Sequence, residues 1–164
     1  MKRCRKPHSG FTLLELMMVV ALIAILISIA IPSLLRSRIA ANESSAISAI
    51  RSVVIGEVSY QTAVYKDIQG DGIGDFGNLD DLYDPAGDGQ PGFIDDALAS
   101  GFSHGYEFVL VPMDGIPGVP PTYTLNANPV MVPNLSARYF YTDQSGVIRI
   151  SRNGPADENS LPLH

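Results

Sequence analysis

The chain has 164 residues but only one cysteine, no tryptophan and three histidines. The single cysteine, Cys4, excludes an intramolecular disulfide. His8 lies near the start of the chain and His164 is its last residue, so His104 is the one histidine in the body of the protein. With no cysteine near His104 and no Ser-His-Asp set in the sequence, we expect no catalytic site and no required cofactor.

Basic residues are also scarce beyond the N-terminus. Four of the 11 lie within the first ten residues, at Lys2, Arg3, Arg5 and Lys6. Without residues 1–10, seven basic residues would face 17 acidic ones, a net charge of −10. An acidic surface of this kind argues against nucleic-acid binding, which needs a basic footprint.

A long apolar run follows the basic start. Residues 11–35 contain a single charged residue, Glu15. A helix of about 20 apolar residues spans a bilayer, and flanking basic residues favour a cytoplasmic N-terminus. A secretory signal would have a shorter apolar run of about 7–15 residues followed by a small residue, whereas Gly10 comes before this run. A plain transmembrane anchor fits the length but gives no role to Glu15, because a lone carboxylate within the membrane is costly.

The segment "GFTLLELMMVVALIAILISIAIPSLL" resembles the N-terminus of type IV prepilins and of type II secretion pseudopilins. This resemblance implies that a peptidase removes residues 1–10 as a leader by cutting between Gly10 and Phe11. It also implies N-methylation of Phe11, with Glu15 as the fifth residue of the mature chain. The implied fold class is α+β and type IV pilin-like, with a long N-terminal helix on a small antiparallel β-sheet.

In this family the glutamate meets the N-terminal amine of a neighbouring subunit, because a buried charge is tolerable when it is paired. The resemblance therefore assigns assembly to Glu15, Phe11 and the apolar residues Leu13, Leu14 and Leu16. The implied partners are further copies in a helical filament, the prepilin peptidase and N-methyltransferase, an inner-membrane assembly platform and the lipid bilayer. The chain would begin as a single-pass protein of the bacterial inner membrane and end in a periplasmic or cell-surface filament.

These inferences describe a structural subunit of a type IV pilus or of a type II secretion pseudopilus. The lack of a cysteine pair removes the disulfide-bounded loop of many type IV pilins, which favours a pseudopilin-like or minimal pilin. The alternative is a monomeric, membrane-anchored extracytoplasmic binding protein with a calcium-dependent loop.

We expect one helix from Phe11 to about Val64, with a membrane and polymerisation segment at 11–35 and an amphipathic half at 36–66. Pro32 should kink it or melt it locally, and a helix that ends at the membrane surface is the alternative. The apolar stripe of the second half would be Ile39, Ile47, Ile50, Val54 and Val58. The charged residues Arg36, Glu43, Arg51 and Glu57 lie off this stripe. Gly56 would weaken the helix.

Residues 67–104 form an acidic, glycine-rich loop region in which nine aspartates lie between positions 67 and 96. Two segments, "DIQGDGIGDFGN" and "DPAGDGQPGFID", share the pattern D-x-x-G-D-G of a calcium loop. The candidate calcium ligands are Asp67, Gln69, Asp71, Asp75, Asn78, Asp84, Asp88 and Asp95. Neither segment has the glutamate expected at the twelfth place, and a solvated loop whose Asp-Gly pairs make turns is the alternative.

Residues 105–152 are rich in aromatic and β-branched residues and predict an antiparallel β-meander. The predicted strands are 105–113, 121–130, 137–143 and 146–152. Candidates for the two faces of the sheet are Tyr106, Phe108, Tyr123, Leu125, Tyr139, Tyr141, Val147 and Ile148. We expect the tail, residues 153–164, to be disordered.

Overall fold

The computed structural model describes residues 11–87, 89, 92–130 and 137–163. Residues 1–10, which include Gly10 of the predicted leader, lie outside the described residues, as does Asp88 of the second acidic segment. The chain divides into two compact units, Met1–Arg38 and Ile39–His164. Helix α1, Leu13–Thr62, contributes to both.

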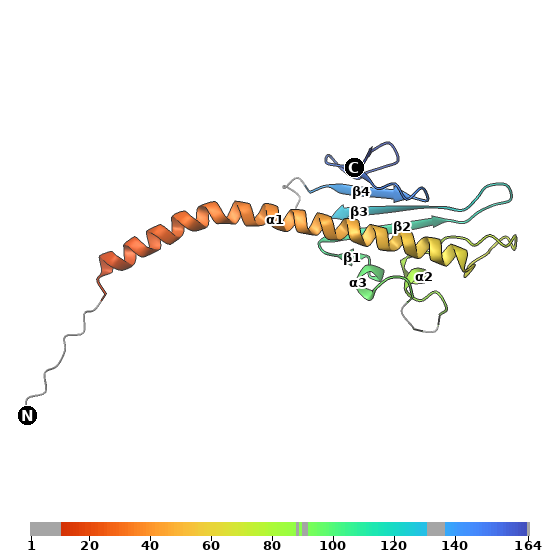
Figure 1. Cartoon of the computed structure of the whole chain (residues 1–164), viewed down its shortest axis with the longest axis horizontal. Helices are drawn as coiled ribbons and strands as arrows, with labels where there is room; N and C mark the ends of the chain where they lie inside the picture. Colours follow the sequence, from red (N-terminus) through yellow and green to blue (C-terminus); the bar gives the residue numbers. More distant parts are fainter. Residues whose placement is uncertain (1–10, 88, 90–91, 131–136, 164) are drawn as a thin grey trace, which may run out of the picture. The chain divides into compact units, whose positions relative to one another are not determined.

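The predicted α+β arrangement is confirmed, because a long N-terminal helix packs through its second half on an antiparallel sheet (Figure 1). Helix α1 has 50 residues and continues through Pro32, so the alternative of a helix ending near that proline is wrong. Residues 28–32 remain helical, so the expected local melting is absent, and a kink at Pro32 stays a prediction. The helix ends before Val64, whose φ of 54° lies in the left-handed region that β-branched residues avoid.

The buried face of α1 differs from the predicted stripe. The buried residues are Glu43, Ala46, Ile50, Val53, Gly56, Glu57 and Tyr60. Ile50 is buried as expected, but Val58 is 55% exposed, so the stripe is rotated from its predicted position. The expectation that Glu43 and Glu57 face away from the core is wrong, because both carboxylates find hydrogen-bond donors there.

Gly56 lies where α1 faces Phe93 and Ile94. A Cβ atom at this position would lie 3.2 Å from Cβ of Phe93 and 3.7 Å from side-chain atoms of Ile94 and Leu82. Glycine therefore lets this segment pass close to the helix, which offsets its low helix propensity.

In the described part of the chain, six strands in chain order, β1-β2-β3-β4-β5-β6, form an antiparallel meander. Their bounds are Phe102–Ser103, Tyr106–Met113, Thr122–Pro129, Tyr139–Asp143, Arg149–Ser151 and Leu161–Pro162. The four predicted strands correspond to β2, β3, β4 and β5, with β5 shorter than expected. Alternate residues of β2 and β3 point into the core, which also contains Ile50 and Val53 of α1. These inward residues are Tyr106, Phe108, Leu110, Tyr123, Leu125 and Ala127.

The acidic region contains two short helices, α2 at Leu79–Tyr83 and α3 at Asp96–Ala99, where the sequence predicted only loop. Asn78 caps α2 in a reciprocal capping box with Asp81, and Asp95 caps α3 by accepting from the Leu98 amide. In the sequence, each of these helices is marked only by a polar residue that caps a single turn. A search for hydrophobic periodicity does not detect so short a helix.

The expectation of a disordered tail is wrong for its described residues. Strand β6 pairs with β5, and Nη1 of Arg149 donates to the Ser160 carbonyl at 3.2 Å. Ala156 is 4% exposed, and Tyr141 is 8% exposed although its neighbours on β4 point into the core. Burial raises the pKa of Tyr141, assisted by the charges of Asp143, of Glu158 and, to a smaller extent, of Asp157. The tail therefore packs back near the sheet.

Candidate functional site

Helix α1 begins with a side-chain cap. Oγ1 of Thr12 accepts the backbone N–H of Glu15 at 3.2 Å, and the Thr12 carbonyl accepts that of Leu16 at the same distance. Glu15 thus lies in the first turn, where the helix dipole favours a negative charge. The pattern T-x-x-E is a capping-box signature that the sequence analysis missed.

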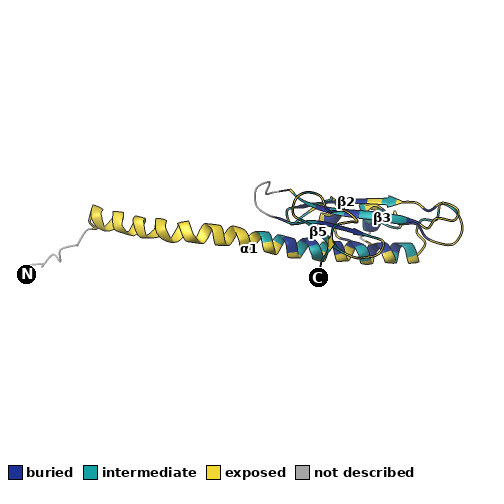
Figure 2. Cartoon of the chain, turned by 90° about the horizontal axis from the view of Figure 1, so that it is seen from above, coloured by how far each residue is buried: buried dark blue, intermediate teal, exposed yellow. Residues whose placement is uncertain are grey.

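The first half of α1 is exposed along its whole length. Every residue from 11 to 38 is exposed, including Phe11 at 77% and Leu13 at 78% (Figure 2, yellow). Burial of apolar surface is the main favourable term in folding, so an uncovered apolar helix requires a membrane or other apolar surfaces around it. By length and composition this helix can cross a membrane, and it fits a single-pass anchor.

Glu15 has no ion-pair partner in the described part of the chain, where the two ion pairs are Glu43–Arg138 and Lys66–Asp114. Its carboxylate and the exposed residues Leu13, Leu14 and Leu16 are therefore available to a second molecule. The assembly roles of these residues and of Phe11 stay predictions.

A charged pair joins the second half of α1 to the start of β4. Glu43 accepts from the Arg138 backbone N–H through Oε1 and from Nε through Oε2, both at 2.9 Å. Nη2 of Arg138 lies 2.8 Å from the same Oε2, and the guanidinium lies 5.7 Å from the ring centroid of Phe140. Three donors on one residue thus compensate for the burial of the Glu43 carboxylate.

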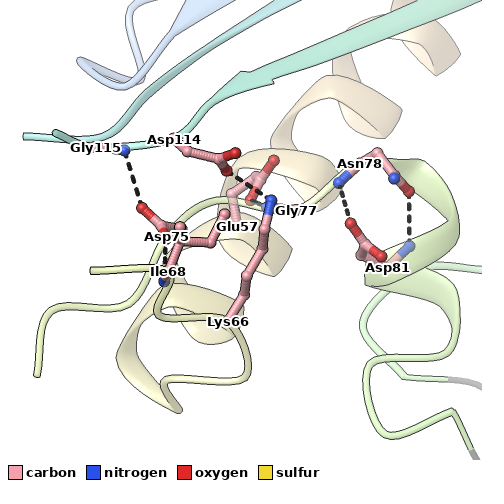
Figure 3. Close-up of polar contacts among 9 residues, drawn as sticks. All are labelled: Glu57, Lys66, Ile68, Asp75, Gly77, Asn78, Asp81, Asp114 and Gly115. Carbon is pink, nitrogen blue, oxygen red and sulfur yellow. Dashed lines mark hydrogen bonds and ion pairs between the residues drawn. The ribbon is translucent and has the colours of Figure 1, made fainter. Parts of the chain in front are cut away.

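Glu57 is a second carboxyl group inside the fold (Figure 3). It is fully buried, and Oε2 accepts the Gly77 backbone N–H at 3.0 Å, while Oε1 has no partner in the described residues. Burial raises the pKa of Glu57 to about 8, opposed by the Gly77 hydrogen bond and assisted by the charge of Asp81. The group is therefore mostly a neutral acid at pH 7.

Asp75 is also fully buried but is held as a carboxylate. Oδ2 accepts the Ile68 backbone N–H at 2.9 Å, and Oδ1 accepts that of Gly115 at 3.0 Å (Figure 3). These hydrogen bonds, that of Ile68 first, hold the pKa of Asp75 below its usual range against the effect of burial. Asp75 thereby ties the acidic region to the loop after β2, next to the ion pair of Lys66 and Asp114 at 2.6 Å.

The two acidic segments do form matching loops. Asp67 accepts from the Gly72 backbone N–H and Asp84 from that of Gly89, each at 3.0 Å and each five residues ahead. Asn78 and Asp95 have separate local tasks, because they cap different helices. The described residues contain no group of three or more His, Cys, Asp or Glu side chains placed to hold a metal ion. Calcium binding stays a prediction.

A long exposed apolar helix joined to an antiparallel sheet defines the pilin-like class of α+β proteins. Residues 5–31 match the family model of the prokaryotic N-terminal methylation motif, the hallmark of type IV prepilins and pseudopilins. The chain therefore carries a prepilin-type N-terminus, and the predicted resemblance is confirmed. No curated protein and no solved structure gives a significant match.

Proposed function

We propose that this protein is a structural subunit that is cut between Gly10 and Phe11, methylated at Phe11 and polymerised through the first half of α1 into a filament. The observation that carries the proposal is the exposure of every residue from 11 to 38 in a segment that bears the methylation motif. Such a helix can serve first as a membrane anchor and later as the apolar core of a filament. The subunit needs no catalysis of its own.

The filament is either a type IV pilus or the short pseudopilus of type II secretion. The single cysteine excludes a disulfide-bounded loop, which favours a pseudopilin-like or minimal pilin. The inner membrane is the site of insertion, with the basic N-terminus in the cytoplasm by the positive-inside rule.

Mass spectrometry of the N-terminus tests the proposal on protein from membranes and from sheared surface material. A chain that begins at N-methyl-Phe11 is the expected result, and its presence in the sheared fraction would identify a surface filament. An unprocessed chain in a host that has the peptidase would overturn the proposal and favour a monomeric, membrane-anchored binding protein.

A further inference from the structure

A cavity of about 420 Å³ lies in the unit Ile39–His164, lined by α1, the segment 93–98 and the turn between β1 and β2. Ile94 and Leu98 are buried residues of its apolar part, and the half-buried ring of Phe93 adjoins them. None of its lining residues takes part in the polar contacts of Figure 3. The cavity is therefore a separate feature from the buried carboxyl groups.

The α1 wall of the cavity carries hydroxyl groups. Ser45, Ser48 and Ser52 line it at spacings that share one face of a helix. Serines within helices commonly donate to a preceding carbonyl, as Ser52 does to Ser48 at 3.2 Å. The hydroxyls of Ser45 and Ser48 make no such bond within the described part of the chain, so they can bind a ligand.

The opposite wall carries an oriented imidazole. His104 has a φ of 50°, and its Nδ1 lies 2.8 Å from Oγ of Ser103. That hydrogen bond restrains the ring and leaves its second nitrogen for another partner. Asp95 adds a carboxylate whose Oδ1 caps α3, and the described residues that line the cavity include no lysine or arginine.

We propose that this cavity binds a neutral saccharide unit. Its volume falls within the range of about 300–1,000 Å³ that is typical of small-molecule sites. Hydroxyl groups, one imidazole and one carboxylate can exchange hydrogen bonds with sugar hydroxyls, while the apolar residues can contact the C–H face of a sugar ring. A carboxylate without a neighbouring cation disfavours phosphates and other anions.

Saturation-transfer NMR on the full chain tests this site, with lactose, maltose and chitobiose as probes. Methyl phosphate, whose methyl protons the method can observe, is the anionic comparison. Lipid nanodiscs should hold the protein, because maltoside detergents present sugar head groups of their own. We expect a signal from at least one disaccharide and none from methyl phosphate. No signal from any of the three sugars, or a signal from methyl phosphate, would overturn the proposal.

Two variants locate the binding. Ser48→Phe should fill the cavity and weaken binding at least about tenfold, a loss of about 1.4 kcal/mol. Ser44→Phe is its control on the exposed surface of α1, outside the lining, and should bind as the native chain does. His104→Asn, which tolerates the left-handed backbone, should also weaken binding without a change in fold. Binding that survives both cavity variants, or falls equally in the control, would overturn this location.

Discussion

Glu57 is a fully buried carboxyl group, and one of its two oxygens has no hydrogen-bond partner among the described residues. An unfolded chain releases this proton near the ordinary pKa of 4.5, whereas the folded chain keeps it to about 8. The unfolded state therefore binds fewer protons between these values, and this group lowers stability as the pH rises from about 4.5 to 8.

We predict that Glu57→Gln removes this dependence. Relative to the variant, the native chain should lose up to about 1.4 kcal/mol per pH unit across that window. Urea unfolding of the full chain in nanodiscs, followed by tyrosine fluorescence from pH 4 to 9, measures the difference. Glu158→Gln, at an exposed tail position, is the control and should leave the slope unchanged. Parallel curves for the native chain and Glu57→Gln would refute the assigned protonation.

A substitution of Arg138 tests how much the Glu43 contact stabilises the fold, because Arg138 donates charge-assisted hydrogen bonds to the Glu43 carboxylate. Arg138→Met keeps the apolar stem but leaves the 11% exposed Glu43 side chain with only a backbone donor. We predict a loss of about 2 kcal/mol in the free energy of unfolding, below the ~3–5 kcal/mol for fully buried pairs.

Lys66→Met is the matched control, because it breaks the more exposed pair with Asp114, whose side chains are 32% and 41% exposed. Exposed pairs contribute about 0–1 kcal/mol, so this variant should change the urea midpoint only slightly. Equal losses of unfolding free energy in the two variants would show that the Glu43–Arg138 contact stabilises the fold no more than an exposed ion pair does.

Among the elements, the start of α1 combines two functions in four residues. Thr12 caps the helix, and Glu15 places a carboxylate in its first turn. Loss of a cap costs about 1 kcal/mol of local helix stability. Under the proposed function, loss of the charge would instead remove a partner for the amine of another subunit.

We predict that Glu15→Gln is inserted and cleaved normally but enters filaments poorly, while Thr12→Ala enters them nearly as well as the native chain. Immunoblots of membrane and sheared fractions, with N-terminal mass spectrometry, separate these steps. If Glu15→Gln gave as many filaments as the native chain, the charge-pairing mechanism would be excluded. An equal defect in Thr12→Ala would assign the effect to the helix start instead.

Element prediction succeeded where the local pattern was strong. The 50-residue helix and strands β2 and β3 follow from long runs of suitable residues. Helices α2 and α3 have five and four residues, too short for periodicity, and their signals were the caps Asn78 and Asp95. Strand β6 has two residues and forms by pairing with β5, which no local pattern reports.

At the scale of the whole molecule, the tail completes the sheet-bearing unit. We predict that deletion of residues 153–164 uncovers Tyr141 and removes β6, one of the two strands that pair with β5. Amide exchange of Arg149–Ser151 should then rise well above that of β2, which keeps β3 as its neighbour. Hydrogen–deuterium exchange with mass spectrometry measures it, and unchanged protection of β5 would show that the tail contributes nothing to the sheet.

The sequence alone determined the membrane-compatible helix, the basic start and the methylation motif, because each depends on residues adjacent in the chain. Tertiary structure decided which face of α1 is buried. Glu43 and Glu57 have the local pattern of solvent-facing residues, but their donors come from Arg138 and Gly77, 95 and 20 residues away. A carboxyl group can enter a core when the fold brings donors to it, and no window of neighbouring residues contains those donors.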